Sequence, residues 1–466
     1  MSQEPANSAV EPDPLRVFRV LAPVFGLLFL FLTPPFQVPD EPEHFDRAYQ
    51  LSEARILGRI DASGERPRAG GVLPKSLQDA AALAMGDIPH DENAKVDRTA
   101  LRKALAVPLE PRDRAFLEFP STVLYSPVPY LPQAAAAGWG RLAAARPLVL
   151  LYIMRLANWL SWILLVGAAI KTTPIFKWVF LLLALTPMSL AQAASASADA
   201  FANGTAFLFI ALVLRAALGP EPSVGRRTRL ALMVLAAAVA LCKPVYAILP
   251  LFVLVVPASR LGGPGKKRAF AARLILVAWG LTAAWALAAS GASVPLQAGA
   301  SVSGQFQNVL SHPSVFVSAL GHSLAVHVRD HLPEFIGQLG WLDVTLPLGL
   351  VWAFYFALIG AGLIDKTPGL VWSRGRRAFS LGLAAAGGLA ILLMIYAFWN
   401  PVGSPGIEGV QGRYFIPFGP LAFLALYNLR LSPRLRDSRP ARLALTAFAA
   451  FAPALALFVL VLRYYF

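Results

Sequence analysis

One polar stretch, Phe36-Gln37-Val38-Pro39-Asp40-Glu41-Pro42-Glu43-His44-Phe45-Asp46-Arg47-Ala48-Tyr49, directly follows the first strongly apolar run of the chain. Five of its side chains are carboxylates or an imidazole, namely Asp40, Glu41, Glu43, His44 and Asp46. Nowhere else does the sequence gather groups that transfer protons beside a predicted membrane surface. If the protein is an enzyme, we expect its catalytic base in this stretch.

The composition determines the class of protein. Of the 466 residues, 57% are hydrophobic and only 14% are charged, which is too apolar for an ordinary soluble protein. Repeated apolar runs of about 20 residues are each long enough to cross a hydrocarbon core of about 30 Å. Because lipid offers no hydrogen-bond partners, such runs satisfy their backbone groups as helices. The sequence therefore predicts an all-α, polytopic integral membrane protein.

The formal net charge of +15 would suit a nucleic-acid partner if the basic residues formed a patch. Instead, they gather in short loops between apolar runs, a distribution that keeps loops on the cytoplasmic side of a bacterial inner membrane. We therefore expect no nucleic-acid partner, and anionic membrane lipids are among the partners we predict. The single cysteine, Cys242, lies in an apolar run and excludes an internal disulfide.

The charges also predict a topology. Residues 1–14 read as a cytoplasmic tail, and the apolar run from Leu15 to Phe36 lacks a cleavage site, so it reads as an uncleaved anchor. Arg16 and Arg19 flank its inner side, which places Asp40 outside. Residues 15–466 then form a single transmembrane domain with about eleven spans and an external C-terminus. The expected spans are 15–36, 148–170, 175–194, 199–219, 229–243, 244–259, 270–291, 344–364, 378–398, 413–430 and 442–464.

Two long extracytoplasmic loops are expected, at 38–147 and 293–343. In the first loop, the spacing of apolar residues predicts interfacial helices over 40–57 and 73–85. We interpret 125–145 as re-entrant or interfacial, because only then do the later basic loops fall on the cytoplasmic side. The spans 229–243 and 244–259 meet at Lys243-Pro244, and basic residues at their outer ends favour a hairpin over one long helix.

Under this topology, three basic residues, Arg155, Lys243 and Arg413, form a candidate cationic site at the outer lipid interface. An ionisable residue at membrane depth is costly, so it usually faces protein or water. Guanidinium groups suit phosphate oxygens, and an ammonium adds a point charge. The ligand that this predicts is an anionic lipid headgroup, such as a phosphate bearing a sugar.

Three segments carry a family resemblance: Pro39-Asp40-Glu41-Pro42-Glu43-His44-Phe45, Lys243-Pro244 and Gln411-Gly412-Arg413-Tyr414-Phe415. They resemble the hallmarks of a bacterial family of predicted membrane proteins, domain of unknown function 2142. That family is similar to GT-C-type glycosyltransferases, which use polyprenyl-phosphate-linked sugars. The resemblance covers the chain from about Leu15 to Phe418.

The resemblance implies that an acidic residue in the first external loop is the catalytic base and that basic residues hold the donor phosphate. Asp40 matches the acidic position, with Glu41 as the adjacent alternative, and Arg413 matches a donor-phosphate position. The substrate-binding residues that it suggests are Lys243, Arg155, Asp199, His44, Gln411 and Tyr414. A well-studied GT-C metal motif is not evident, so no metal ligands are assigned and a divalent metal stays open as a cofactor.

Several of these residues also have a structural interpretation. Asp40 can be the N-cap of the first interfacial helix, with Glu43 completing a capping box. Arg413 and Lys243 can reach the interface with their charged ends while their stems stay in the span.

Arg155 can pair with a structural carboxylate, Asp199 can cap its helix, and His44 can be a packing or hydrogen-bonding residue. His327 and His331 have the spacing of two metal ligands on one helix face, but no glutamate or cysteine completes a motif.

We predict a membrane glycosyltransferase that moves a sugar from a polyprenyl-phosphate donor to a glycan, lipid or protein acceptor of the cell envelope. The first alternative is a transporter or flippase of an anionic lipid-linked sugar, which would need charged groups near the bilayer midplane and broken helices. The second is a non-catalytic protein of envelope-polysaccharide assembly.

Overall fold

A computed structural model describes residues 12–427 and 438–466, apart from 366 and 368. Most of the predicted tail, 1–14, and the last residues of the predicted span 413–430 lie outside this part of the chain. The described residues are mostly helical with a few short strands, so the predicted all-α class is confirmed.

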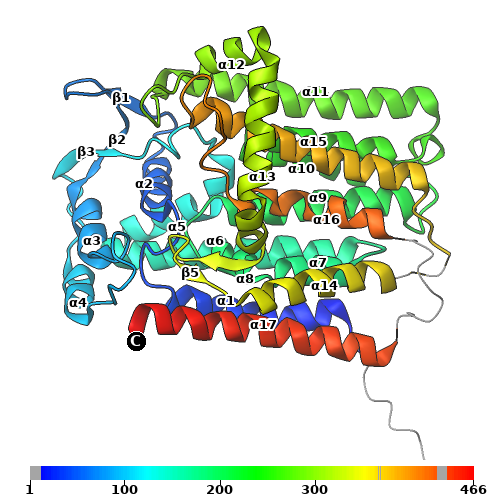
Figure 1. The fold of residues 1–466 in the computed structure, drawn as a ribbon, viewed down its shortest axis with the longest axis horizontal. Coiled ribbons are helices and arrows are strands. Elements are labelled where there is room, and N and C mark those ends of the chain that lie inside the picture. Colours follow the sequence, from blue (N-terminus) through cyan, green and yellow to red (C-terminus); the bar gives the residue numbers. More distant parts are fainter. Residues whose placement is uncertain (1–11, 366, 368, 428–437) are drawn as a thin grey trace, which may run out of the picture.

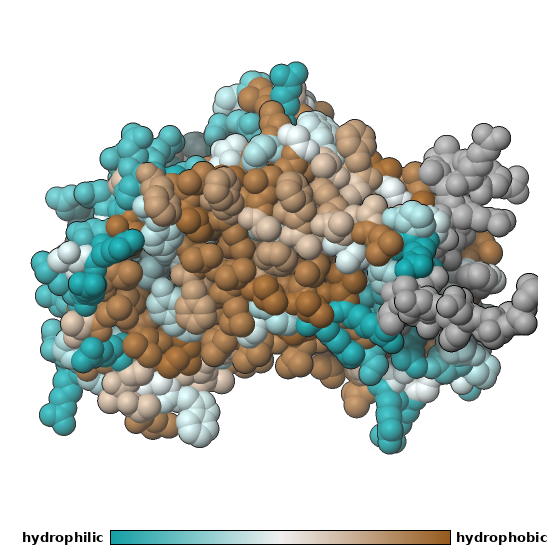
Figure 2. All heavy atoms as spheres, turned by 90° about the horizontal axis from the view of Figure 1, so that it is seen from below, coloured by the Kyte–Doolittle hydropathy of each residue, from teal (hydrophilic) through white to brown (hydrophobic). Residues whose placement is uncertain are grey.

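Each predicted span coincides with a helix or a series of short helical turns. Their bounds are α1 Pro14–Leu32, α6 Pro147–Thr172, α7 Lys177–Ala184, α8 Pro187–Ala193, α9 Asp199–Leu218, α10 Arg226–Cys242, η2 Pro244–Val255, η3 Ala258–Leu261, α11 Pro264–Ala289, α14 Leu348–Ile364, α15 Arg374–Phe398, η5 Gly412–Phe418, α16 Gly419–Phe423, η6 Leu424–Leu426 and α17 Arg439–Tyr465. The long helices run side by side (Figure 1), and an apolar belt separates two polar ends on the face in Figure 2.

Within the described residues, six helices are long and apolar enough to cross a membrane. They are α1, α6, α9, α11, α15 and α17. A seventh candidate combines α12 (Val302–Ser311) with α13 (Pro313–Gly337), two helices bent by 105° at a short break. The chain is thus a multi-pass membrane protein, and the figure of about eleven spans stays a prediction.

A small polar layer covers one end of the bundle, which we call the sheet end (Figure 1). It contains the antiparallel sheet of β1 (Arg59–Asp61), β2 (Arg68–Pro74) and β3 (Arg114–Glu118), with α3 (Lys75–Met85) and α4 (Arg98–Ala106) beside it. Helix α3 confirms the helix predicted over 73–85. The sheet was not predicted, because its strands are short and the sequence between 86 and 120 has weak periodicity.

Helix α2 (Glu41–Ser52) packs against α5 (Leu131–Leu142) at the sheet end. It buries the apolar face that the sequence predicts, including Phe45 and Tyr49, but it ends before the predicted residue 57. The earlier end has a local cause, because Gln50 donates to the carbonyl of Leu57 and Arg47 to that of Ile56, which turns the chain back. At 12 residues, α5 is too short to span the bilayer, in agreement with the re-entrant or interfacial prediction for 125–145.

Helix α13 runs across the bundle instead of along it (Figure 1). It packs against η5, the segment that carries Arg413. The contact is close at Gly412, where an added Cβ would lie 2.3 Å from the carbonyl oxygen of His331. Only glycine fits at this crossing, so α13 fixes where η5 begins.

Candidate functional site

The backbone at Asp40 is unusual. Its φ of 62° places it in the left-handed region, which is uncommon for residues other than glycine, although aspartate tolerates it better than most. Asp40 occupies the N-cap position of α2, but its side chain makes no capping hydrogen bond. The capping-box interpretation is therefore wrong, because this conformation turns the carboxylate away from the first turn of the helix.

Glu41, the next residue, points into the protein interior. Its carboxylate pairs with the guanidinium of Arg155 at 2.5 Å, and both side chains are fully buried. Arg155 gives its remaining donors to the carbonyls of Leu30, Thr33 and Pro34 at the end of α1. All five guanidinium N–H groups are thereby used. This geometry matches the structural alternative for Arg155. The hydrogen bonds of Arg155 join α6 to the end of α1 and to the start of α2, the residue after Asp40.

Four charged groups lie close together near the Glu41–Arg155 pair. Arg413 Nη2 donates to Asp40 Oδ2 at 2.9 Å, and its Nε lies 4.0 Å from Asp199 Oδ2. Lys243 Nζ donates to Asp199 Oδ1 at 2.7 Å. Each group comes from the end of a different helical segment: α2, η5, α9 and α10. The side chains of Arg413, Asp199 and Lys243 are largely buried, whereas that of Asp40 is 37% exposed. Asp40 is thus the accessible member of the cluster.

Asp199 does not cap α9, contrary to its structural alternative. Its Oδ1 accepts from Lys243 and its Oδ2 from Gln192 Nε2 at 2.9 Å. Asn203, one turn further along α9, in turn donates to Gln192 Oε1. The sequence did not single out Gln192, because an amide in an apolar run gives no signal until the fold brings it to a charged neighbour.

Some hydrogen-bond donors of the Arg413 guanidinium have no acceptor in the described residues. Its Nε and Nη1 are buried and make no hydrogen bond within the described residues, although the residue is only 3% exposed. A buried charged donor without an acceptor is costly. An anion at this position would relieve that cost.

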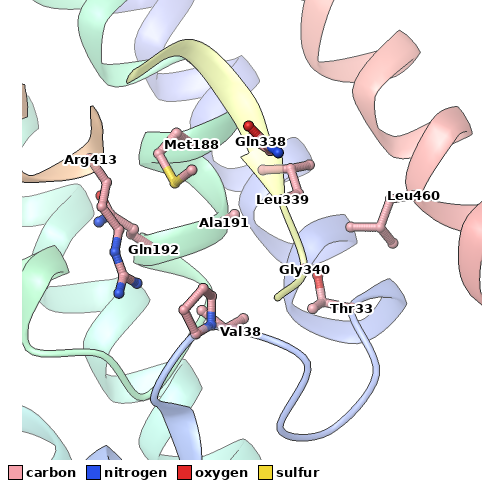
Figure 3. A pocket seen from close by; sticks show the side chains of 11 residues that line it. Thr33, Val38, Met188, Ala191, Gln192, Gln338, Leu339, Gly340, Arg413 and Leu460 are labelled. Atoms are coloured by element: carbon pink, nitrogen blue, oxygen red, sulfur yellow. The ribbon is translucent and has the colours of Figure 1, made fainter. Parts of the chain in front are cut away.

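Arg413 also contributes to the lining of a narrow pocket (Figure 3). Its lining is Thr33, Val38, Pro39, Met188, Ala191, Gln192, Gln338, Leu339, Gly340, Arg413 and Leu460. Arg413 enters beside Gln192, across from Gly340 and Leu460. Arg413 is the only charged residue of this lining, and most of the other side chains are apolar. The pocket has room for about one water molecule in this form, and its lining places one cation beside mostly apolar side chains.

Aromatic rings surround the cations. Lys243 Nζ lies 4.7 Å from the ring centre of Tyr414 and 5.5 Å from that of Tyr125. The guanidinium of Arg413 lies 5.4 Å from the same Tyr414 ring. Tyr414 therefore lies within cation–π distance of both cations and stabilises both. Gln411, at the start of η5, has a buried Oε1 without a hydrogen-bond partner in the described chain.

His44 lies one turn after Asp40 and is buried. Its Nδ1 is 2.6 Å from the hydroxyl of Tyr130, a residue that sequence reasoning did not assign to the site. Burial lowers the pKa of His44 to about 4, and the nearby carboxylates of Asp40 and Asp199 only partly oppose this. The imidazole is neutral at pH 7, so it can donate or accept a hydrogen bond but adds no charge to the cluster.

Glu43 was also missed as a candidate, although it belongs to the opening stretch. Its Oε2 accepts from the backbone N–H and the hydroxyl of Ser121. Burial raises the pKa of Glu43 to about 7; the hydrogen bonds to Ser121 lower it, and the charge of Asp40 raises it further. At neutral pH, Glu43 is thus poised between its two protonation states.

Helix α13 supports the site through Glu334. Glu334 Oε2 accepts from the N–H of Gly412 at 2.6 Å and lies 3.1 Å from His331 Nδ1. His327 lies 3.6 Å from Asp330 in the same helix. The described residues contain no group of three His, Cys, Asp or Glu side chains that could hold a metal ion. The two histidines have carboxylate partners, and Glu334 holds the backbone next to Arg413.

Residues 24–422 match the model of a family described as predicted membrane protein (DUF2142). No curated protein matches the sequence. Among solved structures, one similar chain is ArnT from Cupriavidus metallidurans, in a crystal structure with undecaprenyl phosphate bound. The two chains are 17% identical with a TM-score of 0.40, and the match covers 90% of this chain and 61% of ArnT. This chain therefore spans about three fifths of the length of that protein.

Proposed function

This chain belongs to the DUF2142 family of predicted membrane proteins, and we propose that it is a glycosyltransferase of the GT-C type. It moves a sugar from a polyprenyl-phosphate donor to a hydroxyl of a cell-envelope acceptor on the extracytoplasmic face. The envelope acceptor is a glycan, a lipid or a protein. Asp40 is the base, and Arg413, with Lys243 nearby, holds the donor phosphate.

One observation carries this proposal: a buried guanidinium with two unused donors lies beside an apolar pocket and contacts a half-exposed carboxylate. Phosphate oxygens accept from such donors in a forked geometry. A prenyl chain would have to widen the pocket, and the apolar lining would then contact its first part. The pairing of a phosphate-binding cation with an accessible base is what transfer of a sugar from a lipid phosphate requires.

The proposed reaction uses these groups as follows. The acceptor oxygen forms a bond to the anomeric carbon of the sugar while its proton passes to the carboxylate of Asp40. The bond between that carbon and the phosphate oxygen breaks, and its electron pair stays on the phosphate. Arg413 stabilises the charge that develops there, because its donors are already oriented and shielded from water.

The contact between Arg413 and Asp40 gives the ligand-free site a defined resting state. A donor phosphate would compete with Asp40 for the guanidinium, since both are oxyanions. When the phosphate also takes the Nη2 donor, in addition to the unused Nε and Nη1, Asp40 loses its ion-pair partner and its carboxylate is free to accept the proton of the acceptor. Donor binding would thereby prepare the base for the acceptor.

Glu41 has a supporting role in this proposal. Both of its oxygens are engaged, one with Arg155 alone and the other with Arg155 and the N–H of Ala196. A carboxylate that is fully buried and paired cannot reach an acceptor hydroxyl. Glu41 and Arg155 therefore position Asp40 and do not take part in the chemistry.

The flippase alternative draws on one feature of the fold, the interrupted helices α7–α8 and η5–α16–η6. However, the charged groups that it needs near mid-span lie instead at the ends of helical segments. This favours the transferase. The non-catalytic alternative has no specific support in the arrangement of the site.

The test uses cells that lack the protein, restored with wild type, Asp40→Asn or Asp79→Asn, followed by a mass profile of the surface glycans. Asp79 is exposed on α3 and is a matched control. We expect wild type and Asp79→Asn to restore a missing sugar, and Asp40→Asn at equal abundance in the membrane to fail.

Full restoration by Asp40→Asn would overturn the assignment of the base. A defect in which the sugar-loaded lipid accumulates on the cytoplasmic side would instead point to the flippase. Accumulation on the outer side fits the transferase.

A further inference from the structure

A second candidate binding site lies at the end of the bundle opposite the sheet end. It is a groove between the end of η2 and the first turns of α11 and α15, which begin at the same end of the bundle (Figure 1). Its walls include Leu254, Val255, Lys267, Gly375, Arg376 and Phe379. None of the residues that line it is acidic. The groove is therefore positively charged and apolar at once.

The two basic side chains of the groove make different contacts with the protein. Lys267 Nζ donates to the carbonyl of Leu254 at 2.7 Å, which leaves two of its three protons available. Arg376 lies 5.3 Å from the ring centre of Trp372 and makes no ion pair in the part of the chain described. Both side chains are partly buried, so their charges are screened less than those of free surface residues. The start of two helices at the groove adds to the positive potential.

The apolar wall of the groove is partly exposed. Leu254 at the groove is 40% exposed. On α11 itself, Leu276 (68%) and Leu287 (77%) are exposed on the side of the helix away from Lys267. A candidate membrane span with large exposed apolar side chains packs against acyl chains. At the groove, the exposed side chain of Leu254 can contact the first part of an acyl chain whose headgroup lies between the basic residues.

We propose that this groove binds an acidic phospholipid, with its phosphate between Lys267 and Arg376 and the start of its acyl chains against Leu254 and Phe379. The charges at the groove are all of one sign and the wall beside them is apolar, which complements a lipid with an anionic headgroup. This site is independent of the proposed transferase activity, because it lies at the other end of the bundle and shares no lining residue with the Arg413 pocket.

The test uses full-length protein in detergent and native mass spectrometry. Phosphatidylglycerol is compared with phosphatidylcholine of the same acyl chains, and inorganic phosphate is added as a competitor. We expect bound phosphatidylglycerol and little phosphatidylcholine. Because each basic residue near an anionic lipid contributes about a fivefold change in binding, Lys267→Gln and Arg376→Gln should each weaken binding about fivefold.

The matched control is Arg226→Gln, an exposed arginine at the start of α10 that does not line the groove. We expect it to bind phosphatidylglycerol as wild type does. Equal binding of the two lipids, or wild-type binding by both groove variants, would overturn the proposal. Displacement of the lipid by inorganic phosphate at equal concentration would also overturn it, because the site would then recognise a free anion. Thermal unfolding of each variant distinguishes loss of the site from loss of the fold.

Discussion

Arg413 Nη2 and Asp40 Oδ2 lie 2.9 Å apart, although 373 positions separate the two residues in the chain. The contact joins the first polar stretch of the protein to the last segment that carries a family motif. It is held from both sides, since the pair of Glu41 and Arg155 fixes the start of α2 and Glu334 fixes Gly412. The following predictions test the roles of Arg413, of the Glu41–Arg155 pair, of Glu43 and of Gly412.

Arg413 should determine affinity for a polyprenyl phosphate. Charge-assisted hydrogen bonds contribute about 1.5–3 kcal/mol, so Arg413→Gln should weaken binding by about 10- to 100-fold. Arg413→Lys keeps the charge but loses the forked donors, and it should recover only part of the affinity. Titration of the purified protein with undecaprenyl phosphate measures this. Arg268→Gln, an exposed arginine on α11, is the control, and unchanged affinity in Arg413→Gln would refute the prediction.

The buried pair of Glu41 and Arg155 should be a determinant of stability. Removing one partner leaves an uncompensated buried charge, which costs about 3–5 kcal/mol. We therefore expect Glu41→Gln to lower the unfolding temperature strongly and Glu41→Gln with Arg155→Met to recover part of the loss. The exposed pair of Arg215 and Glu221 offers the comparison, where Glu221→Gln should have little effect. Equal effects of the two single variants would contradict this role.

Glu43 should make stability depend on pH. Its pKa is raised in the folded protein to about 7 from an ordinary value of 4.5, mainly by burial. Between pH 4.5 and 7, the folded state binds more protons than the unfolded state, so stability falls as pH rises through this window. Glu43→Gln stays neutral and should be more stable than wild type at pH 8, on the order of 1 kcal/mol, with no difference at pH 4.

Thermal unfolding of both proteins between pH 4 and 8 measures this dependence. Glu92→Gln, at an exposed position, should show the same pH profile as wild type. A parallel profile for Glu43→Gln and wild type would rule out Glu43 as the group that titrates.

The close contact at Gly412 should be necessary for phosphate binding. An alanine Cβ there would lie 2.3 Å from the His331 carbonyl oxygen and 2.5 Å from the Phe335 nitrogen, so η5 must shift and carry Arg413 with it. We expect Gly412→Ala to lose most of its affinity for undecaprenyl phosphate. Gly321→Ala on α13 has open space around its Cβ and should bind normally, with a gain of about 0.5–1 kcal/mol in stability. Normal binding by Gly412→Ala would show that α13 does not position Arg413.

Much of the framework follows from local sequence. Apolar runs of sufficient length form helices wherever the backbone cannot reach water, so the positions of the predicted spans agree with the observed helices. The segment from 36 to 49 could be recognised because charged groups rarely gather beside an apolar run. The sheet could not be predicted, since its pairing of Gly70 with Glu118 depends on distant partners. Likewise, nothing local indicates that α13 crosses the bundle.

The sequence alone determined which residues are candidates for the site, because an ionisable group next to a membrane span needs a partner or a function. Only the tertiary structure decided which groups each one contacts. Asp40 and Glu41 are equivalent carboxylates by sequence, yet the left-handed backbone at Asp40 directs the first to Arg413 and the second to Arg155 in the core. Arg155 and Arg413 cannot be told apart by sequence, but packing gives every N–H of Arg155 an acceptor and leaves Nε and Nη1 of Arg413 without a hydrogen bond in the described residues. Which donors stay unused depends on the carbonyls and carboxylates that other helices bring within reach, and no local pattern encodes those distances.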